Sequence, residues 1–140
     1  MTDREIELKY RVADPAVADA LLRAAAIGRF EAAGEVEATE LLDRFLDTGD
    51  GAFRARRHAL RLRTVRDRTT LTIKGPSERV AGGAVSRLEL EAIVGGDDPR
   101  GWPPSPAHEL VDAIAGGRPL REIGRIAQHR RSRLVRSEET

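Results

Sequence analysis

Several segments of the chain alternate between apolar and polar residues with a period of two. Residues 4–12 show it most clearly, since Ile6, Leu8, Tyr10 and Val12 share one face and charged residues occupy the other. The same alternation recurs at 59–65, 69–74 and 85–94, and more weakly at 37–47. This period is typical of half-buried strands. The short connection at 66–68 further predicts that the strands on either side of it form a hairpin.

Two helices are predicted between the strands. Asp14 followed by Pro15 is a typical N-cap and first turn, so a helix is expected from there to about Gly28. A shorter helix is expected over residues 106–115, where two glycines end it. Residues 120–136 fit either a strand or a basic helix, and we favour the strand. Residues 95–106, rich in Gly, Asp and Pro, form the one linker-like stretch.

The apolar faces of these strands are predicted to pack against the helices and form the core. The residues assigned to this core are Ile6, Leu8, Tyr10, Leu60, Leu62, Leu71, Ile73, Leu88, Leu90 and Ala92. The opposite faces of the same strands carry the ionisable side chains.

Length and composition limit the classes of protein to which the chain can belong. Its 140 residues are enough for one domain. The absence of cysteine excludes disulfides, thiolate nucleophiles and cysteine-ligated zinc, and the three scattered histidines lack zinc-ligand spacing. No apolar run is long enough to span a membrane and no apolar signal segment follows Met1, so a cytoplasmic location without membrane contact is expected.

The charges are nearly balanced overall but are unevenly placed. The net charge of +1 gives no general nucleic-acid signature, so specific nucleic-acid binding is not expected. Of the 24 basic residues, only Lys9 and Lys74 are lysines. Both lie on the ionisable faces of predicted strands. One interpretation is that these lysines have a role in binding. The other is that the composition is biased toward arginine and the two lysines remain by chance.

Like charges occur in pairs on these ionisable faces, at positions i and i+2 of one strand. Three such pairs are Glu5/Glu7, Arg61/Arg63 and Glu89/Glu91. Neighbours on one face of a strand lie roughly 6–7 Å apart, so an ordinary solvated face gains nothing from them. Paired carboxylates suit a hard cation such as Mg²⁺ or Mn²⁺, and paired guanidinium groups with a lysine suit phosphate oxygens. Together they predict a site for a metal-bound compound carrying several phosphates.

These segments resemble the CYTH domain, the triphosphate tunnel metalloenzyme family. Glu5-Ile6-Glu7-Leu8-Lys9 fits its opening ExExK signature. The other matching segments follow in the family's order: DRFLDT at 43–48, with Phe45 in place of the usual Tyr, ALRLR at 59–63, LTIKG at 71–75 and RLELE at 87–91. The resemblance covers about residues 3 to 135. It implies an α+β fold in which an antiparallel β-barrel with flanking helices forms a charged tunnel.

The resemblance also implies an activity and the residues that carry it. The activity is metal-dependent hydrolysis of inorganic triphosphate or a short polyphosphate, with Mg²⁺ or Mn²⁺ as cofactor. The residues implied to bind phosphate are Lys9, Arg61, Arg63, Lys74, Arg87 and Arg130, with Arg131 as an alternative to Arg130. The residues implied to hold the metal are Glu5, Glu7, Glu89 and Glu91, and Glu5, Glu7 and Lys9 are the expected catalytic set. Two other functions stay open: a polyphosphate- or nucleotide-binding module without turnover, and, less favoured, a class IV-type adenylyl cyclase.

One departure from the family pattern affects the expected domain. The family's tunnel usually has eight strands, with an acidic strand near the C-terminus, whereas five or six strands are predicted here. Residues 1–136 are therefore expected to form a tunnel domain that lacks its last strands, with 137–140 as a tail. A second copy of the chain, forming a homodimer, or a further C-terminal segment would complete such a barrel. In many bacterial members of the family a helical CHAD domain follows.

Overall fold

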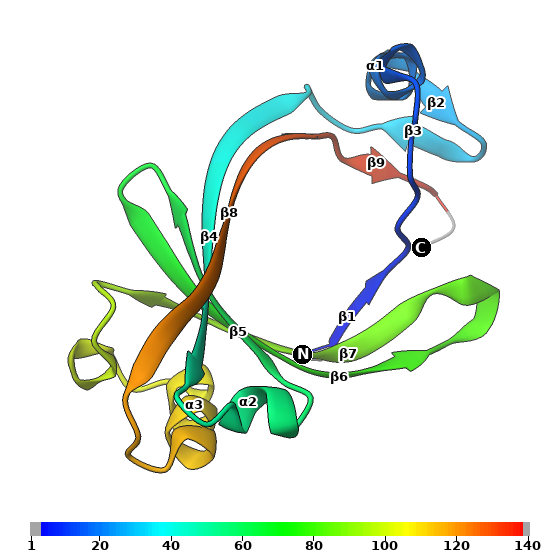
Figure 1. The fold of residues 1–140 in the computed structure, drawn as a ribbon. Coiled ribbons are helices and arrows are strands. Elements are labelled where there is room, and N and C mark those ends of the chain that lie inside the picture. The colour runs from blue at the N-terminus through cyan, green and yellow to red at the C-terminus, as the bar shows by residue number, and fades with distance from the viewer. Residues whose placement is uncertain (1–3, 139–140) are drawn as a thin grey trace. The chain divides into compact units, whose positions relative to one another are not determined.

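A computed structural model of the protein describes residues 4–138, which divide into two compact units (Figure 1). The first unit consists of residues 4–8 and Leu41–Gln128, and the second of Lys9–Glu40 and 129–138. The ends of the expected domain and tail, residues 1–3 and 139–140, lie outside the described residues.

A six-stranded sheet dominates the first unit, with strand order β1-β7-β6-β5-β4-β8. Its strands are β1 (Arg4–Glu7), β4 (Glu37–Thr48), β5 (Ala59–Val65), β6 (Arg68–Arg79), β7 (Val85–Val94) and β8 (Leu120–Ser132). The ladders from β1 to β4 are antiparallel. In the hairpin of β5 and β6, Val65 pairs with Arg68, and the turn between them places Arg66 at φ 57°.

Helix α3 (Pro106–Ala115) covers one face of this sheet by packing on β6 and β7. Ser105 caps its N-terminus by accepting the His108 N–H at 3.0 Å, and Gly116, at φ 59°, ends it in the left-handed conformation. Short elements complete this unit: α2 (Ala52–Ala55) and the 3-10 turns Ala81–Gly83 and Pro99–Gly101.

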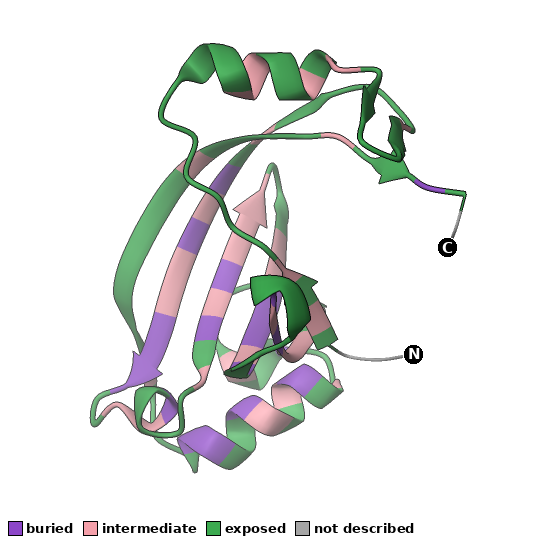
Figure 2. Ribbon diagram, turned by 90° about the vertical axis from the view of Figure 1, so that its right-hand side faces the viewer, coloured by how far each residue is buried: buried purple, intermediate pink, exposed green. Residues whose placement is uncertain are grey.

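The core lies between α3 and the sheet and is built from the apolar side of the strands. Leu62, Leu71 and Ile73 are fully buried and pack with Val111 and Ile114 of the helix. Buried positions alternate with more exposed ones along β5 (Figure 2). This is the alternation that places the polar residues of the same strands on the other face of the sheet.

The second unit contains α1 (Pro15–Arg23) and a small antiparallel sheet of β2 (Ala26–Ile27), β3 (Phe30–Ala32) and β9 (Val135–Arg136). Asp14 caps α1 by accepting the Ala16 N–H at 2.9 Å. At the other end of the helix, the Arg133 guanidinium donates to the carbonyl oxygens of Leu22 and Ala24, at 2.6 and 2.5 Å. This side chain therefore satisfies carbonyl groups that a helix end leaves without partners.

Most predicted elements are present, with changes at their ends. The strands at 59–65 and 85–94 and the helix at 106–115 are confirmed at the predicted bounds, and residues 120–132 form a strand. The strand predicted to end at Gly75-Pro76 instead continues to Arg79. A register shift between Lys74 and Ser77 lets the ladder with β7 resume beyond the proline. Helix α1 ends at Arg23, before the expected Gly28, and α2, β2 and β3 were not predicted.

The core assignment was wrong for the first predicted strand. Ile6, Leu8 and Tyr10 are 68%, 51% and 80% exposed, and β1 ends at Glu7. The reason is position in the sheet: β1 is an edge strand beside β7, while the helix packs on β6 and β7. The apolar period was read correctly, but α3 lies against β6 and β7 rather than against this edge strand.

The predicted antiparallel, sheet-rich fold with few helices is confirmed, but a closed barrel is not found. In the part of the chain that the structure describes, β1 and β8 are the two edges of the six-stranded sheet and do not pair with each other. No helix within residues 4–138 has the length and apolar character needed to cross a membrane.

Candidate functional site

The face of the large sheet opposite α3 carries a group of ionisable side chains, here called the charged face. Its members in the first unit are Glu5 of β1, Arg87, Glu89 and Glu91 of β7, Lys74 of β6, Arg61 and Arg63 of β5, and Asp43 of β4. The strand register explains why they meet. Glu5 lies opposite Arg87, Lys74 opposite Glu89, and Arg63 opposite Asp43. Directly opposed residues on neighbouring strands are within reach of each other's side chains.

Asp43 fixes the guanidinium group of Arg63. The Arg63 Nε and Nη2 donate to the two carboxylate oxygens at 2.7 and 2.9 Å, and Gln128 Nε2 donates to Oδ2 at 3.0 Å. The Asp43 side chain is 1% exposed. The hydrogen bonds with Asp43 raise the pKa of Arg63, so the guanidinium stays ionised. Arg63 is thereby held in one orientation on the charged face.

Arg61, two residues along the same strand, is less well satisfied. Its Nε is 4.0 Å from Asp43 Oδ1, beyond hydrogen-bonding distance, and its Nη2 donates weakly to Thr72 Oγ1 at 3.4 Å. The Nε is buried and has no hydrogen-bond partner among the described residues. Burial, followed by repulsion from Arg63, lowers the pKa of Arg61. A buried cationic donor without a partner is costly, and an anion bound here would supply the missing acceptor.

At the β1 side of the charged face, Lys74 joins two carboxylates. Its Nζ is 2.6 Å from Glu5 Oε2 and 3.9 Å from Glu89 Oε2, while Arg87 Nε is 3.8 Å from Glu5 Oε2. Burial opposes ionisation of Glu5, but the hydrogen bond and charge of Lys74 outweigh it, so the pKa of Glu5 is lowered. Glu5 is therefore an anion held between two cations.

Glu89 has the opposite tendency. Burial, and then a hydrogen bond with Glu91, raise its pKa to about 7, and the nearby charge of Glu5 adds to this. Near neutral pH, a proton on Glu89 thus relieves repulsion among three carboxylates of β1 and β7. A divalent cation would relieve the same repulsion, and carboxylate oxygens are the ligands that Mg²⁺ and Mn²⁺ prefer. The chemistry of these donors therefore fits a metal.

The geometry does not yet assemble a metal centre. Among residues 4–138, no three acidic or histidine side chains are arranged as a ready-made set of ligands. Glu7 is half-buried, like Glu5, and lies opposite Val85 in the register. The assignment of Glu5, Glu7, Glu89 and Glu91 as metal ligands stays a prediction.

Apart from Glu7, the predicted site residues fall into two groups according to the unit in which they lie. Arg61, Arg63, Lys74, Arg87, Glu5, Glu89 and Glu91 lie together on the charged face. Lys9 and Arg130 belong to the second unit, so their roles in binding phosphate, and that of Lys9 in catalysis, stay predictions. Arg131, the alternative to Arg130, also lies there, and its Nη1 is 2.6 Å from Asp19 Oδ1 of α1.

Sequence reasoning assigned no role to Asp43 and Gln128. Asp43 opens the DRFLDT segment at 43–48. It is a buried aspartate on a strand that neighbours an Arg-x-Arg strand, and this position could have indicated its pairing with arginine. Gln128 carries no such signal. It belongs to β8, whose place beside β4 depends on the tertiary fold.

Comparison with known proteins identifies relatives of this chain. The family model for the CYTH domain matches residues 3–139. A search of curated proteins finds no match.

Three solved structures share the fold. The first is a Hippeastrum protein described as an adenylyl cyclase candidate with a dominant triphosphatase activity, with 18% identity and a TM-score of 0.60 over 86% of this chain. The others are adenylate cyclase candidates from Vibrio parahaemolyticus (16% identity, TM-score 0.55) and Bacillus halodurans (15%, 0.52), each matching 93% of this chain. The chain covers only 62%, 62% and 65% of these three proteins.

Proposed function

This chain belongs to the CYTH domain family, and we propose that it takes part in the metal-dependent hydrolysis of a triphosphate. The substrate class is inorganic triphosphate or a short linear polyphosphate, with Mg²⁺ or Mn²⁺ as the metal. The observation that carries the proposal is the meeting of an acidic group and a basic group on one face of a single sheet. Glu5, Glu89 and Glu91 form the first, and Arg61, Arg63, Lys74 and Arg87 form the second.

The basic residues would bind the phosphate chain in different ways. Arg63 donates two of its five N–H groups to Asp43, so its guanidinium is held in one orientation and can offer its other donors to a phosphate oxygen. Arg61 has a buried Nε without a partner and can donate directly to a phosphate oxygen. Lys74 can move its ammonium from Glu5 to an entering phosphate, because an ammonium is a compact point charge on a flexible stem.

The carboxylates would hold the metal on the β1–β7 side of the charged face. When bound, the divalent cation would neutralise charge on the terminal phosphoryl group and lower the pKa of a bound water. If Lys74 turned toward phosphate, Glu5 would lose the nearer of its two cationic partners and would become a better metal ligand. Glu89, whose pKa is about 7, can take up or release a proton at its carboxyl group near neutral pH.

The structural neighbour described as having triphosphatase activity supports hydrolysis over cyclisation as the first reaction to test. A binding module without turnover is the second candidate. It is favoured by one observation, the lack of an assembled ligand set for a metal within the described residues. Binding of phosphate alone requires only the basic group.

The test is phosphate release from inorganic triphosphate by this chain with Mg²⁺, with Mn²⁺ and with EDTA. Hydrolysis predicts release with metal and none with EDTA. The paired variant Glu89→Gln/Glu91→Gln should abolish release while triphosphate binding, followed by calorimetry, persists. Release that survives in this variant would overturn the metal assignment. Binding without release in the unmodified chain would favour the binding module.

A matched control uses carboxylates that lie outside the charged face. Glu109 on α3 and Glu78 on the exposed end of β6 carry the same charge and contact neither Lys74 nor Arg61. Changing both to Gln keeps the net charge equal to that of the paired variant. We expect this control to retain the activity of the unmodified chain.

A further inference from the structure

A second basic site adjoins the charged face in the first unit. A hollow of ≈ 310 Å³ lies beside α2 and the start of β5. Four basic residues contribute to its wall: Arg54, Arg57, His58 and Arg87. Phe45, Leu46, Leu60 and Ile123 supply apolar surface. None of the family motifs in the sequence includes Arg54 or Arg57, and the proposed hydrolysis does not use them.

Two of the arginines in this hollow, Arg54 and Arg57, have no acidic partner among the described residues, and both are exposed. Asp47 is the one acidic residue among the described residues that line the hollow. Its Oδ1 accepts the N–H groups of Thr48 and Phe53 at 2.7 and 3.0 Å, and its Oδ2 accepts the Arg54 N–H at 3.2 Å.

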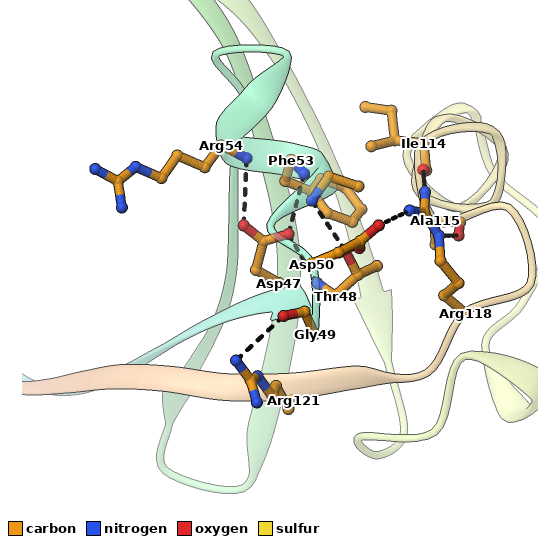
Figure 3. Close-up of polar contacts among 11 residues, drawn as sticks. Asp47, Thr48, Gly49, Asp50, Phe53, Arg54, Ile114, Ala115, Arg118 and Arg121 are labelled. Carbon is orange, nitrogen blue, oxygen red and sulfur yellow. Dashed lines mark hydrogen bonds and ion pairs between the residues drawn. The ribbon is translucent and has the colours of Figure 1, made fainter.

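In these three hydrogen bonds, both oxygens of Asp47 accept backbone N–H groups, one at the end of β4 and two in α2. Figure 3 shows them, and shows the Arg54 side chain extending away from the neighbouring Asp50–Arg118 pair. Asp47 therefore shapes the turn that presents Arg54, and its carboxylate is engaged by backbone rather than by the arginines of the hollow.

Arg57 stands where glycine would be the more stable residue. The Arg57 N–H donates to the Arg54 carbonyl oxygen and the His58 N–H to that of Phe53, the pattern of a helix ending in a left-handed residue. Arg57 has φ 58°, which is strained for a residue with a Cβ. These hydrogen bonds hold Arg57 at the wall of the hollow.

Arg87 connects the hollow with the charged face. It lines the hollow, and its Nε is also 3.8 Å from Glu5 Oε2, the atom to which Lys74 donates. An anionic chain bound along Lys74 and Arg87 would thus meet Arg54 and Arg57 where it leaves the charged face.

From this juxtaposition we infer that the hollow lined by Arg54, Arg57 and Arg87 is an extension subsite for the phosphates of a linear polyphosphate beyond the three held on the charged face. The inference rests on the proposed function. The excess of cationic donors (Arg54, Arg57 and Arg87) over the one acidic lining residue that the structure describes (Asp47) favours a chain of phosphates over a nucleoside, because a base needs acceptors as well as donors. A chain of phosphates needs only cationic donors.

The experiment compares the affinities of this chain for inorganic triphosphate, a longer linear polyphosphate and ATP, measured by calorimetry in EDTA so that no turnover occurs. The subsite predicts tighter binding of the longer polyphosphate than of triphosphate. In the variant Arg54→Gln/Arg57→Gly, the ratio of these two affinities should fall about tenfold or more, as expected for loss of charge-assisted hydrogen bonds.

Two controls separate a specific subsite from general charge and from damage to the fold. Arg56→Gln removes an exposed arginine of the same turn that does not line the hollow, and should leave the affinity ratio unchanged. Arg57→Gly alone should keep the melting temperature or raise it by about 2–4 °C, because glycine adopts the left-handed conformation without strain. A fall in the ratio together with retained stability is therefore a binding effect.

Three results would overturn the inference. One is a ratio that Arg56→Gln lowers as much as the double variant, which means a diffuse charge effect. Another is a loss of ATP affinity that exceeds the loss of polyphosphate affinity in the double variant, which assigns the hollow to a nucleoside. The third is binding of triphosphate with no preference for the longer chain, which removes the subsite but keeps the proposed function. If the unmodified chain neither binds nor hydrolyses triphosphate, the proposed function fails as well.

Discussion

Lys74 and Glu5 are joined across an intervening strand. The Lys74 Nζ, on β6, is 2.6 Å from Oε2 of Glu5, on β1, although β7 lies between the two strands. The two residues are 69 positions apart in the chain. The lysine thus links the edge strand to the inner part of the sheet, and it places a cation among the carboxylates of the charged face.

Replacing Lys74 by Gln should weaken triphosphate binding and raise the pKa of Glu5 toward its ordinary value. The lysine is the cation that lowers this pKa, and it is a proposed ligand of phosphate. We expect a loss of affinity of at least about tenfold. Carboxyl-detected NMR titration and calorimetry give the two readouts. Arg79→Gln, at the exposed end of the same strand, is the control and should change neither. An unaltered Glu5 pKa in the lysine variant would contradict the ion pair.

The pKa of Glu89 predicts how this residue affects stability as pH changes. In the folded protein the pKa is about 7, above the ordinary value of 4.5, so between these values the folded state binds more protons at Glu89 than the unfolded state. The contribution of Glu89 to stability is therefore complete below pH 4.5 and is lost as the pH rises to about 7.

Urea unfolding at several pH values, compared between the unmodified chain and Glu89→Gln, measures this contribution. The difference in the free energy of unfolding should change in favour of the variant as the pH rises, because Gln stays neutral. Saturating Mg²⁺ or Mn²⁺ should reverse the trend in the unmodified chain alone. A difference that does not vary with pH would show that Glu89 is not held in its protonated form.

Removing the carboxylate of Asp43 should destabilise the protein and free Arg63. The side chain is buried and accepts two hydrogen bonds from Arg63 and one from Gln128, so Asp43→Ala leaves an unpaired guanidinium beside Arg61. The expected loss in the free energy of unfolding is about 3 kcal/mol. Urea denaturation measures it.

Gln128→Ala is the graded comparison for this prediction. It removes one hydrogen bond to Asp43 and should cost only about 1 kcal/mol. Equal effects of the two substitutions would mean that the Arg63 pair contributes little. A double variant should lose less than the sum of the two single losses, because both act through the same carboxylate.

Truncation of Leu62 tests the location of the core. The residue is fully buried on β5 within the cluster that α3 covers, so Leu62→Ala should cost about 2–5 kcal/mol in the free energy of unfolding. Leu21→Ala on α1 is the matched substitution, and its side chain is 45% exposed. It should cost about 1 kcal/mol or less. Comparable losses at the two positions would contradict the core described above.

The local elements of this protein could be predicted because each has a local physical signal. Alternation of apolar and polar residues marked β5 and β7, and the two glycines after Ala115 marked the end of α3. The same alternation placed Arg61 and Arg63 on the face opposite Leu60 and Leu62. Spacing alone thus determined which side chains share a face, because successive residues of a strand point to opposite sides.

Other features depended on the pairing of distant strands, which has no local signal. Ile6 and Leu71 follow the same period, yet Ile6 is 68% exposed and Leu71 is fully buried, because only the inner strands lie against α3. Three further features likewise exist only once the sheet is assembled. They are the bond from Lys74 to Glu5, the hydrogen bonds by which Asp43 holds Arg63, and the hollow that Arg57 lines. The sequence by itself determined which charged residues could face a ligand. The tertiary structure decided which of these residues form pairs and which are left without a partner. The reason is that the energy of a charge pair depends on distance and burial rather than on order in the chain.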